Sequence, residues 1–258
     1  MQKSKALFLL LLFIPSLACQ YFASSDRGIR IQACSEIVFN VREFHLQARE
    51  VPEHLLRGGQ KQGDEFDVNQ YFSALTHTSM RDGYVLDYVY QIDNLGGYPL
   101  LYPRPFGKQP YASAADIPPN TEWQDFQEYL EVEDTEQGYF EYVVMDIMSD
   151  QFYLFWHANY NDTYIVCNRQ QVYDIVAQID SGELGNVMEP EQQDEARTLK
   201  NIMPAVLLSG DTAVVELVTF TKWGGFYRLI YTISREAPHT IIEIKKENIL
   251  PYDCGVVF

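Results

Sequence analysis

The stretch AVVELVTFTKWGGFYRLIYTIS, residues 213–234, decides the fold class of this chain. Two runs rich in β-branched and aromatic residues flank a Gly-Gly pair, and glycine readily takes the positive φ angles that a two-residue hairpin turn requires. The pattern predicts paired strands at Ala213–Trp223 and Phe226–Ser234, with Trp223 opposite Phe226. In this register one side of the hairpin faces the core and carries Val218, Phe220, Leu229, Tyr231 and Ile233. The side nearer water carries Thr219, Thr221, Arg228 and Thr232.

Strands are predicted on both sides of this hairpin. Thr240–Lys246 follows a Pro-containing turn and is expected to be the next strand. An earlier hairpin is predicted from Tyr139–Met148 and Gln151–His157, which flank the turn-forming pair Ser149-Asp150. We expect Thr163–Cys167 to extend that hairpin into a meander.

The N-terminal half has a weaker pattern. Tyr84–Ile92 alternates like a strand, and Asn94–Gly97 turns it toward a partner at Tyr98–Tyr102. Glu36–Leu46 is expected to be a strand, and Val68–Leu75 a short helix. These elements again favour antiparallel pairing.

Two consecutive helices are predicted after the second hairpin. Arg169–Ile179 has Asn168 as its N-cap, and Glu191–Ile202 ends before Pro204. The first helix has an apolar stripe made by Val172, Ile175, Val176 and Ile179. The sequence therefore predicts an α+β fold of antiparallel hairpins or a meander, with these two helices packed on one sheet face.

The N-terminus has the pattern of an export signal. Lys3 and Lys5 precede the apolar run Ala6–Ile14, which is too short to span a bilayer. Residues 1–18 are predicted to be the signal peptide, residues 19–26 a polar tether, and residues 27–258 a single α+β domain. The Pro-rich loop 103–119 is the candidate internal boundary.

Two alternatives remain for the processing of that signal. An ordinary signal peptidase would cut after Ala18, because Ser16 and Ala18 are small residues at alternate positions. The stretch Ser16-Leu17-Ala18-Cys19 also resembles the lipobox of bacterial lipoproteins, although Ser16 stands where Leu is commonest. We favour lipidation at Cys19, because a cysteine directly after such a signal is rare by chance, and two acyl chains would anchor the protein in a membrane.

The charge is strongly negative and unevenly placed. The net charge is −17, and residues 109–196 hold 19 Asp and Glu against one basic residue, Arg169. This balance argues against nucleic-acid binding and against adsorption on anionic lipid. It is compatible with a cationic protein partner, or with an acidic face that keeps an exported protein soluble.

Four cysteines are present, at positions 19, 34, 167 and 254. If Cys19 carries lipid, three remain and only one disulfide can form; four free cysteines would allow three pairings. We favour Cys167–Cys254, since both lie at ends of predicted strands in the more regular half.

The chain contains no phosphate-binding glycine loop, zinc-protease or EF-hand motif, so no cofactor or metal is predicted. His157 and Asp162 are the best candidates for a catalytic pair, and the carboxylates of Glu122–Glu136 are a second candidate group. A stiff segment offers a binding surface with Tyr98, Tyr102, Phe106 and Tyr111.

These features predict a non-catalytic binding or interaction protein of the bacterial cell envelope, anchored through Cys19. The alternative is a secreted hydrolase that uses the carboxylates or the His157–Asp162 pair. A hydrolase requires two of these groups in one cavity, whereas a binding protein does not.

Overall fold

The computed structural model describes residues 28–94, 96–118, 125–158 and 162–255. Its main sheet is antiparallel in the order β1-β8-β9-β10-β11, and β7 pairs with the end of β9 that β8 leaves free. The strands of this sheet are β1 (Ile29–Arg30), β7 (Tyr164–Val166), β8 (Ala205–Ser209), β9 (Thr212–Thr221), β10 (Gly225–Ser234) and β11 (Ile241–Pro251). The α+β prediction is confirmed.

The β9–β10 hairpin forms, but in a different register from the one predicted. Phe220 lies opposite Phe226 and Leu217 lies opposite Leu229. The turn is formed by residues 222–224 and is therefore longer than the predicted two-residue turn. The Gly224 carbonyl accepts hydrogen bonds from Asn248 Nδ2 at 2.9 Å and from Tyr252 N at 3.3 Å, which hold this longer turn against β11. The resulting shift of three residues, an odd number, exchanges which side chains share a face.

Both faces of this sheet are buried, whereas the sequence predicted that one face would be exposed to solvent. One face joins a core through Val215, Leu217, Leu229, Tyr231 and Ile233. The other face joins a second core through Val218, Phe220 and Phe226. Thr219, expected near water, is only 2 % exposed.

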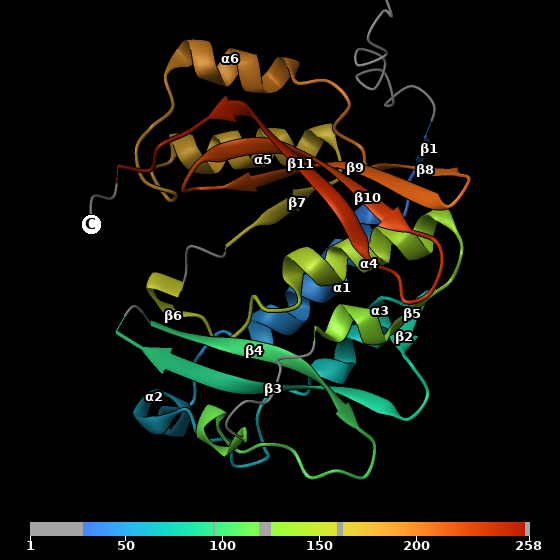
Figure 1. Cartoon of the computed structure of the whole chain (residues 1–258). Helices are drawn as coiled ribbons and strands as arrows, with labels where there is room; N and C mark the ends of the chain where they lie inside the picture. The colour runs from blue at the N-terminus through green and yellow to red at the C-terminus, as the bar shows by residue number, and fades with distance from the viewer. Residues whose placement is uncertain (1–27, 95, 119–124, 159–161, 256–258) are drawn as a thin grey trace, which may run out of the picture.

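Helices α5 (Arg169–Asp180) and α6 (Pro190–Thr198) are the two consecutive helices predicted, and they cover the second of these faces (Figure 1). Asn168 caps α5 as expected, with its side-chain oxygen accepting from Gln171 N at 3.0 Å. The apolar stripe of α5 packs against β7, β9 and β10 through Val172, Val176 and Ile179.

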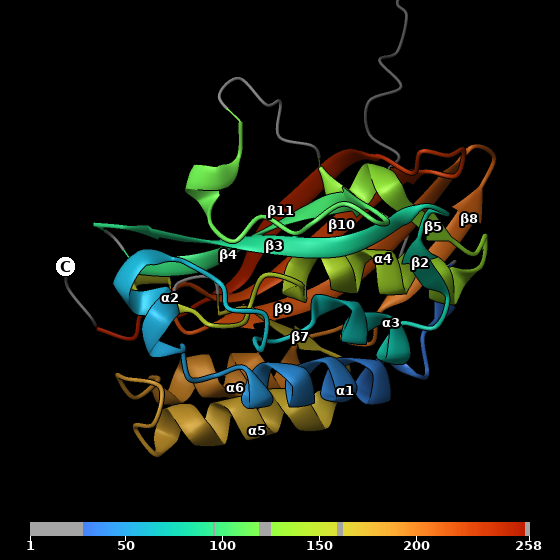
Figure 2. The same ribbon diagram turned by 90° about the horizontal axis from the view of Figure 1, so that it is seen from below.

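Helix α4 (Glu136–Met148) occupies the segment predicted as the first strand of a hairpin, so that prediction is wrong. Thr135 caps the helix, with its hydroxyl accepting from Gly138 N at 3.1 Å. The segment has no amphipathic period, because α4 lies between two sheets and all its residues from Gly138 to Met145 are buried (Figure 2). Of the predicted second strand only β6 (Phe155–Trp156) forms, and it pairs with β4.

Helix α1 (Cys34–Gln47) likewise replaces a predicted strand at Glu36–Leu46. Its buried residues, Cys34, Ile37, Val38 and Val41, follow helical spacing and face α4 and α3. Phe39 and Leu46 on its outer side are each 60 % exposed, which obscured that spacing in the sequence.

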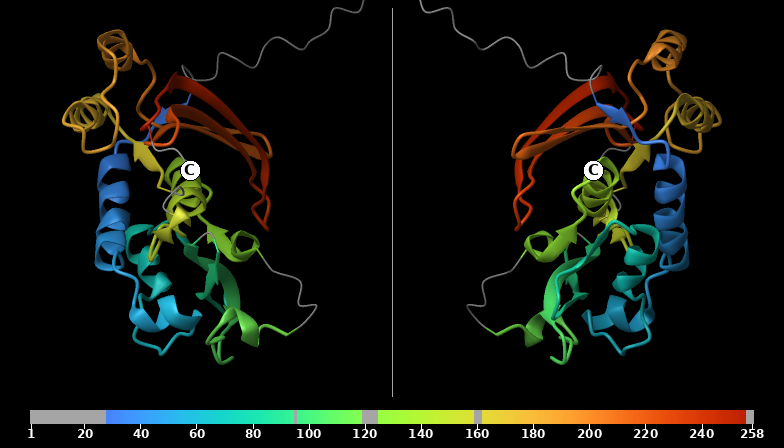
Figure 3. Two further views of the ribbon diagram at one scale, coloured as in Figure 1. Left: turned by 90° about the vertical axis from the view of Figure 1, so that its left-hand side faces the viewer. Right: turned by 90° about the vertical axis from the view of Figure 1, so that its right-hand side faces the viewer.

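A smaller sheet contains β3 (Tyr84–Asp93), β4 (Gly96–Pro105) and β6, and its hairpin follows the prediction. It lies beyond α4 from the main sheet, so that α4 is enclosed between the two (Figure 3). The remaining elements are α2 (Glu53–Gly58), α3 (Tyr71–Ala74), which continues a 3₁₀ turn at Val68–Gln70 as predicted, β2 (Thr78–Met80) and β5 (Leu130–Val132). Short 3₁₀ turns lie at Ala114–Asp116 and Phe126–Tyr129.

A disulfide joins Cys34 to Cys167, with the two Cα atoms 5.6 Å apart. The expected Cys167–Cys254 pair is therefore wrong, and Cys254 is a buried free thiol. The error follows from α1: as a helix it brings Cys34 to the start of α5, where Asn168 Nδ2 also donates to Ser35 Oγ at 2.9 Å. A structural disulfide is typical of an exported domain.

Within the described residues, no helix has the length and apolar character needed to cross a membrane. The predicted signal peptide, the tether and Cys19 lie outside those residues.

Candidate functional site

A cavity of about 400 Å³ opens beside α1 and is lined by three cationic side chains, Arg42, Arg49 and Lys222. We call it the cationic cavity. Arg42 is on α1, Arg49 follows that helix, and Lys222 is in the β9–β10 turn. In the described part of the chain, no carboxylate lies within 4 Å of these three charges. The cavity therefore carries positive charge in a strongly acidic protein.

Among the described residues, Asp162 is the one carboxylate in the lining of this cavity. Burial raises its pKa, whereas the charges of Lys222 and Arg42 and a hydrogen bond with Tyr164 act in the opposite direction. The Tyr164 ring lies under the Arg42 guanidinium, 4.5 Å from its carbon to the ring centroid. Asp162 and Tyr164 thus hold the cations in place without cancelling their combined charge.

His45 forms part of the cavity wall as a neutral ring. Burial, together with the nearby Arg42 charge, lowers the pKa of His45 to about 4. Its Nε2 lies 3.0 Å from the Tyr71 hydroxyl, and the ring also hydrogen bonds to the Met148 backbone. Both partners are protein groups, so His45 is positioned as a structural element of the wall.

Tyr153 lines the same cavity in an unfavourable backbone conformation, with φ +50°. Three hydrogen bonds hold it there: its N donates to Ala48 O at 2.9 Å, its hydroxyl accepts from Phe66 N at 3.1 Å, and its carbonyl accepts from Tyr90 at 2.6 Å. A bulky residue held in the left-handed region is a feature often found at binding sites.

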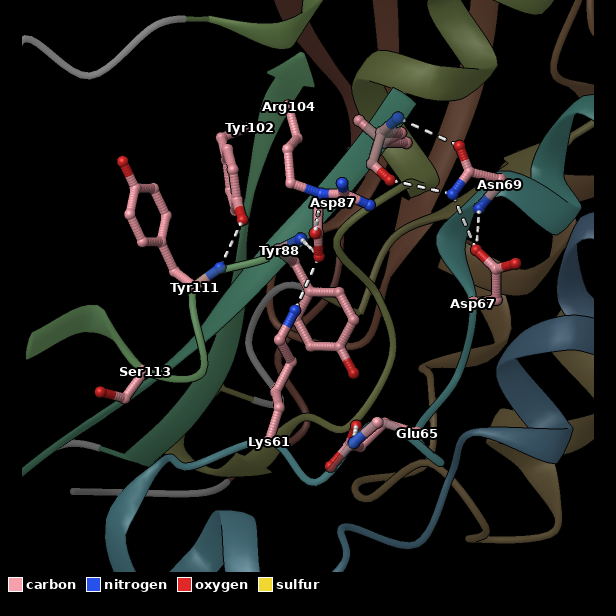
Figure 4. A network of polar contacts seen from close by, with 12 residues as sticks. Lys61, Glu65, Asp67, Asn69, Asp87, Tyr88, Tyr102, Arg104, Tyr111 and Ser113 are labelled. Carbon is pink, nitrogen blue, oxygen red and sulfur yellow. Dashed lines mark hydrogen bonds and ion pairs between the residues drawn. The ribbon is translucent and has the colours of Figure 1, made fainter. Parts of the chain in front are cut away.

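A second cavity, of about 330 Å³, lies between the loop after α2 and the β3–β4 hairpin (Figure 4). We call it the Tyr88 cavity. Asp87 is 8 % exposed at its centre and accepts from Lys61 Nζ at 2.7 Å and Arg104 Nε at 2.6 Å. Phe66 contacts Phe152, with 5.0 Å between ring centroids, so one aromatic layer separates the two cavities.

Glu65 orders the loop that forms one wall of the Tyr88 cavity. Its two carboxylate oxygens accept from Gln62 N at 2.5 Å, Gly63 N at 2.9 Å and His54 Nε2 at 2.6 Å, and these bonds lower its pKa despite its burial. Asp64 completes a group whose ligand atoms lie within 4.8 Å of one another. Because Glu65 already bonds to backbone and His54, the group has a structural explanation and we assign no metal to it.

The predicted aromatic surface is divided by the fold. Tyr102 is 7 % exposed, and its hydroxyl accepts from Tyr111 N at 3.1 Å beside the Tyr88 cavity. Phe106 is 80 % exposed just past the end of β4, and Tyr98 is near the other end of that strand. Their role in binding stays a prediction, now divided between a cavity wall and an exposed tip.

The predicted catalytic groups are not brought into one cavity. His157 follows β6 and stacks at 4.3 Å against Trp156, and it does not line the cavity that Asp162 lines. Glu131 and Glu133 are exposed, and Asp134 forms a two-pronged ion pair with Arg235 at 2.8 and 2.6 Å. Glu122 of this group lies outside the described residues.

Sequence reasoning missed Arg42, Arg49 and Lys222. Arg42 and Arg49 are near each other in the chain, but Lys222 is distant from both, and the fold alone brings it to them. The signal that was present is charge: the bases of the chain lie outside the acidic stretch 109–196, with Arg169 as the exception.

No protein-family model, curated protein or solved structure matches this chain. Its function is therefore inferred from its own residues.

Proposed function

We propose that this chain is a non-catalytic binding protein of the bacterial cell envelope, which holds a small organic anion in the cationic cavity. The observation that carries the proposal is the grouping of Arg42, Arg49 and Lys222 around one cavity, where Asp162 is the single carboxylate in the described part of the lining. In a chain with a net charge of −17, such a local excess of positive charge is a specific feature.

Arginine suits this role, because its planar guanidinium binds carboxylate and phosphate groups through two parallel hydrogen bonds. Arg42 and Arg49 are both exposed, so their charges can be reached from solvent. Lys222 is half-buried and adds a third charge from the β9–β10 turn. The proposed ligand head is therefore a carboxylate or a phosphate.

The rest of the lining favours a ligand that also has an apolar part. The apolar side chains around the cavity are Leu46, Met148, Phe152, Leu154 and Leu184. Small-molecule sites combine such a lining with a few polar groups, in volumes of about 300–1,000 Å³. A short-chain organic acid or phosphate ester fits this combination.

Binding is preferred to hydrolysis because the described lining of the cavity shows no second group placed to act on a bound ligand. His45 is hydrogen bonded on both sides within the protein, and His157 lies outside the lining. The arrangement can hold an anion, but it offers no paired acid and base near it.

The membrane anchor is a separate part of the proposal. Acylation of Cys19 would place the domain at a membrane surface, and the disulfide supports export. Mass spectrometry of the mature N-terminus tests it: an acylated Cys19 is expected, and an unmodified Cys19 or a start elsewhere would contradict it. Recognition of a cationic protein by the acidic stretch 109–196 stays a prediction.

Calorimetric titration with hexyl phosphate and hexanoate tests the anion site, with hexan-1-ol as the uncharged probe. Both anions should bind, more weakly as salt is added, and hexan-1-ol should bind at least tenfold more weakly. Arg42→Gln and Arg49→Gln should each weaken binding of hexyl phosphate by about tenfold.

Arg57→Gln is the matched control, because Arg57 is exposed on α2 in a surface ion pair with Glu53. It should bind hexyl phosphate like the native protein. Equal binding of hexan-1-ol and hexyl phosphate, no binding of either anion, or unchanged binding in Arg49→Gln would each refute the proposal.

A further inference from the structure

Both cations of the Tyr88 cavity are paired with a carboxylate, unlike those of the cationic cavity. Lys61 and Arg104 both donate to Asp87, whose Oδ1 also accepts from Tyr88 N at 2.7 Å. Glu65 accepts from His54 and from two backbone N–H groups. Among the described residues, no cation in this lining is left without a carboxylate, so the cavity is not built to attract an anion.

Tyr88 contributes a buried hydroxyl that the protein itself does not satisfy. The residue is 3 % exposed, and its hydroxyl has no hydrogen-bond partner among the described residues. Its ring is fixed by Lys61 Nζ at 4.6 Å from the centroid and by the edge of Phe152 at 4.9 Å. Figure 4 shows the hydroxyl directed to the side of the cavity that Lys61 and Glu65 form. An unpaired buried hydroxyl is costly, which points to a partner supplied by a ligand.

Other polar groups line the same space and still have bonding capacity. Asp67 uses one carboxylate oxygen to accept from Asn69, at 2.9 Å from its N and 2.8 Å from its Nδ2. Arg104 uses Nε for Asp87 and Nη1 for the Lys108 carbonyl, which leaves Nη2. The cavity therefore offers donors and acceptors together, from two cations, Lys61 and Arg104, and three carboxylates, Glu65, Asp67 and Asp87.

An aromatic and apolar side completes the cavity. Val68 and Pro110 are apolar residues of the lining, and Tyr111 lines the cavity next to Pro110 in sequence while its ring packs against Tyr102, with 5.4 Å between ring centroids (Figure 4). A cavity of about 330 Å³ holds one or two sugar rings, but not a long oligosaccharide. The apolar part of the lining suits the C–H surface of such a ring, while the sugar hydroxyls meet the polar groups.

We infer that the Tyr88 cavity is a binding site for a neutral sugar of one or two rings. A sugar hydroxyl both donates and accepts, so it can pair with the Tyr88 hydroxyl, with Asp67 and with Arg104 at once. This site is distinct from the cationic cavity, and it does not depend on the function proposed for that cavity.

Saturation-transfer NMR and calorimetric titration of the full folded domain with glucose and N-acetylglucosamine test the inference. Glucuronate and glucosamine, which carry one charge each, are the comparison probes. At least one neutral sugar should bind, and it should bind more tightly than both charged sugars. Tyr88→Phe should weaken that binding by about fivefold to tenfold, because it removes one buried hydrogen bond.

Two further measurements separate binding from folding. The free Tyr88→Phe protein should melt at or above the native temperature, since the hydroxyl it lacks had no partner in the protein. Tyr173→Phe is the matched control, because Tyr173 is 39 % exposed on α5, and it should bind the sugar like the native protein.

The inference is overturned if neither neutral sugar binds, if a charged sugar binds more tightly than both, or if Tyr88→Phe binds like the native protein. Hexyl phosphate separates the two proposals, because its binding should be unchanged in Tyr88→Phe. Loss of sugar binding with retained hexyl phosphate binding would thus concern this site alone.

Discussion

At the residue scale, two buried titratable groups respond to acid in opposite directions. Burial, with the Arg42 charge, lowers the pKa of His45 to about 4. Burial, with the Asp146 charge, raises the pKa of Asp150 to about 6. Below pH 6.5 His45 is protonated in the unfolded chain but stays neutral in the folded protein, so the free energy of unfolding falls as the pH is lowered. Below pH 6 the folded chain takes up a proton on Asp150 before the unfolded chain does, so stability rises.

These opposing effects predict a result for single substitutions. Asp150→Asn removes the stabilisation that protonation of Asp150 gives in acid. Between pH 7 and pH 4.5, the free energy of unfolding of this variant should therefore fall by about 2 kcal/mol more than that of the native protein. His45→Gln removes the destabilisation that protonation of His45 in the unfolded chain causes. Over the same pH range its free energy of unfolding should fall by about 2 kcal/mol less than that of the native protein. Urea unfolding at both pH values measures the difference, with Asp82→Asn at an exposed site as the control. Equal pH dependence in all four proteins would disprove the assignment.

At the element scale, the β9–β10 turn depends on Gly225. Its φ is +93°, and a Cβ at this position would lie 2.2 Å from the Leu250 carbonyl oxygen of β11. Gly210, between β8 and β9, also has a positive φ, +54°, but a Cβ there would meet nothing within 4 Å. Alanine at Gly210 would therefore cost only the free energy of the positive φ, whereas alanine at Gly225 would add the free energy of a steric collision.

Gly225→Ala should lower the free energy of unfolding by about 2–4 kcal/mol, because it adds a backbone collision to the positive φ. Gly210→Ala should lower it by about 1 kcal/mol, the conformational cost alone. Chemical denaturation of both variants measures the contrast. Equal losses would mean that β11 does not press against the turn.

The same elements indicate which parts of the fold the sequence could predict. The hairpins β3–β4 and β9–β10 are marked by glycines at their turns, and α5 by a cap and a period of 3.6. Helix α4 has no such mark, because a helix enclosed by two sheets is apolar all round and reads like a buried strand. The register failed because β11, which is distant in sequence, shapes the turn.

The candidate sites were less predictable than the fold. Asp162 and Tyr111 were singled out from local sequence, and each lines a cavity. Neither the arginines of the cationic cavity nor the unpaired hydroxyl of Tyr88 has a local signature, because both depend on which distant segments meet. A single sequence does not show directly which distant segments are in contact.

At the scale of the whole molecule, one covalent bond and two cores hold the layers together. The disulfide joins Cys34 at the start of α1 to Cys167 just before α5, 133 residues further along the chain, and both cysteines belong to the core around α4. A bridge across such a long segment restricts the unfolded chain strongly.

Reduction of this disulfide should lower the free energy of unfolding by about 2–5 kcal/mol, as measured by denaturation with and without reductant. Thiol titration of the mature protein, unfolded without reductant, gives a linked result. One thiol, from Cys254, is expected if Cys19 is acylated, and two if Cys19 is free. Three or more titrating thiols would contradict the disulfide itself.

The Cys34–Cys167 bond also closes residues 34–167 into a covalent ring, from which the C-terminal part of the chain continues, and this determines how the domain responds to a protease. The exposed stretch at 106–110 lies inside the ring. A protease that nicks this stretch opens the ring without releasing a fragment, so the nicked protein keeps its mass until it is reduced. A cut in the exposed stretch 181–183, within that C-terminal part, has no such protection. A proteolytic cut therefore releases a fragment from some parts of the chain and not from others. The half that contains the Tyr88 cavity is the half that stays covalently attached after a cut.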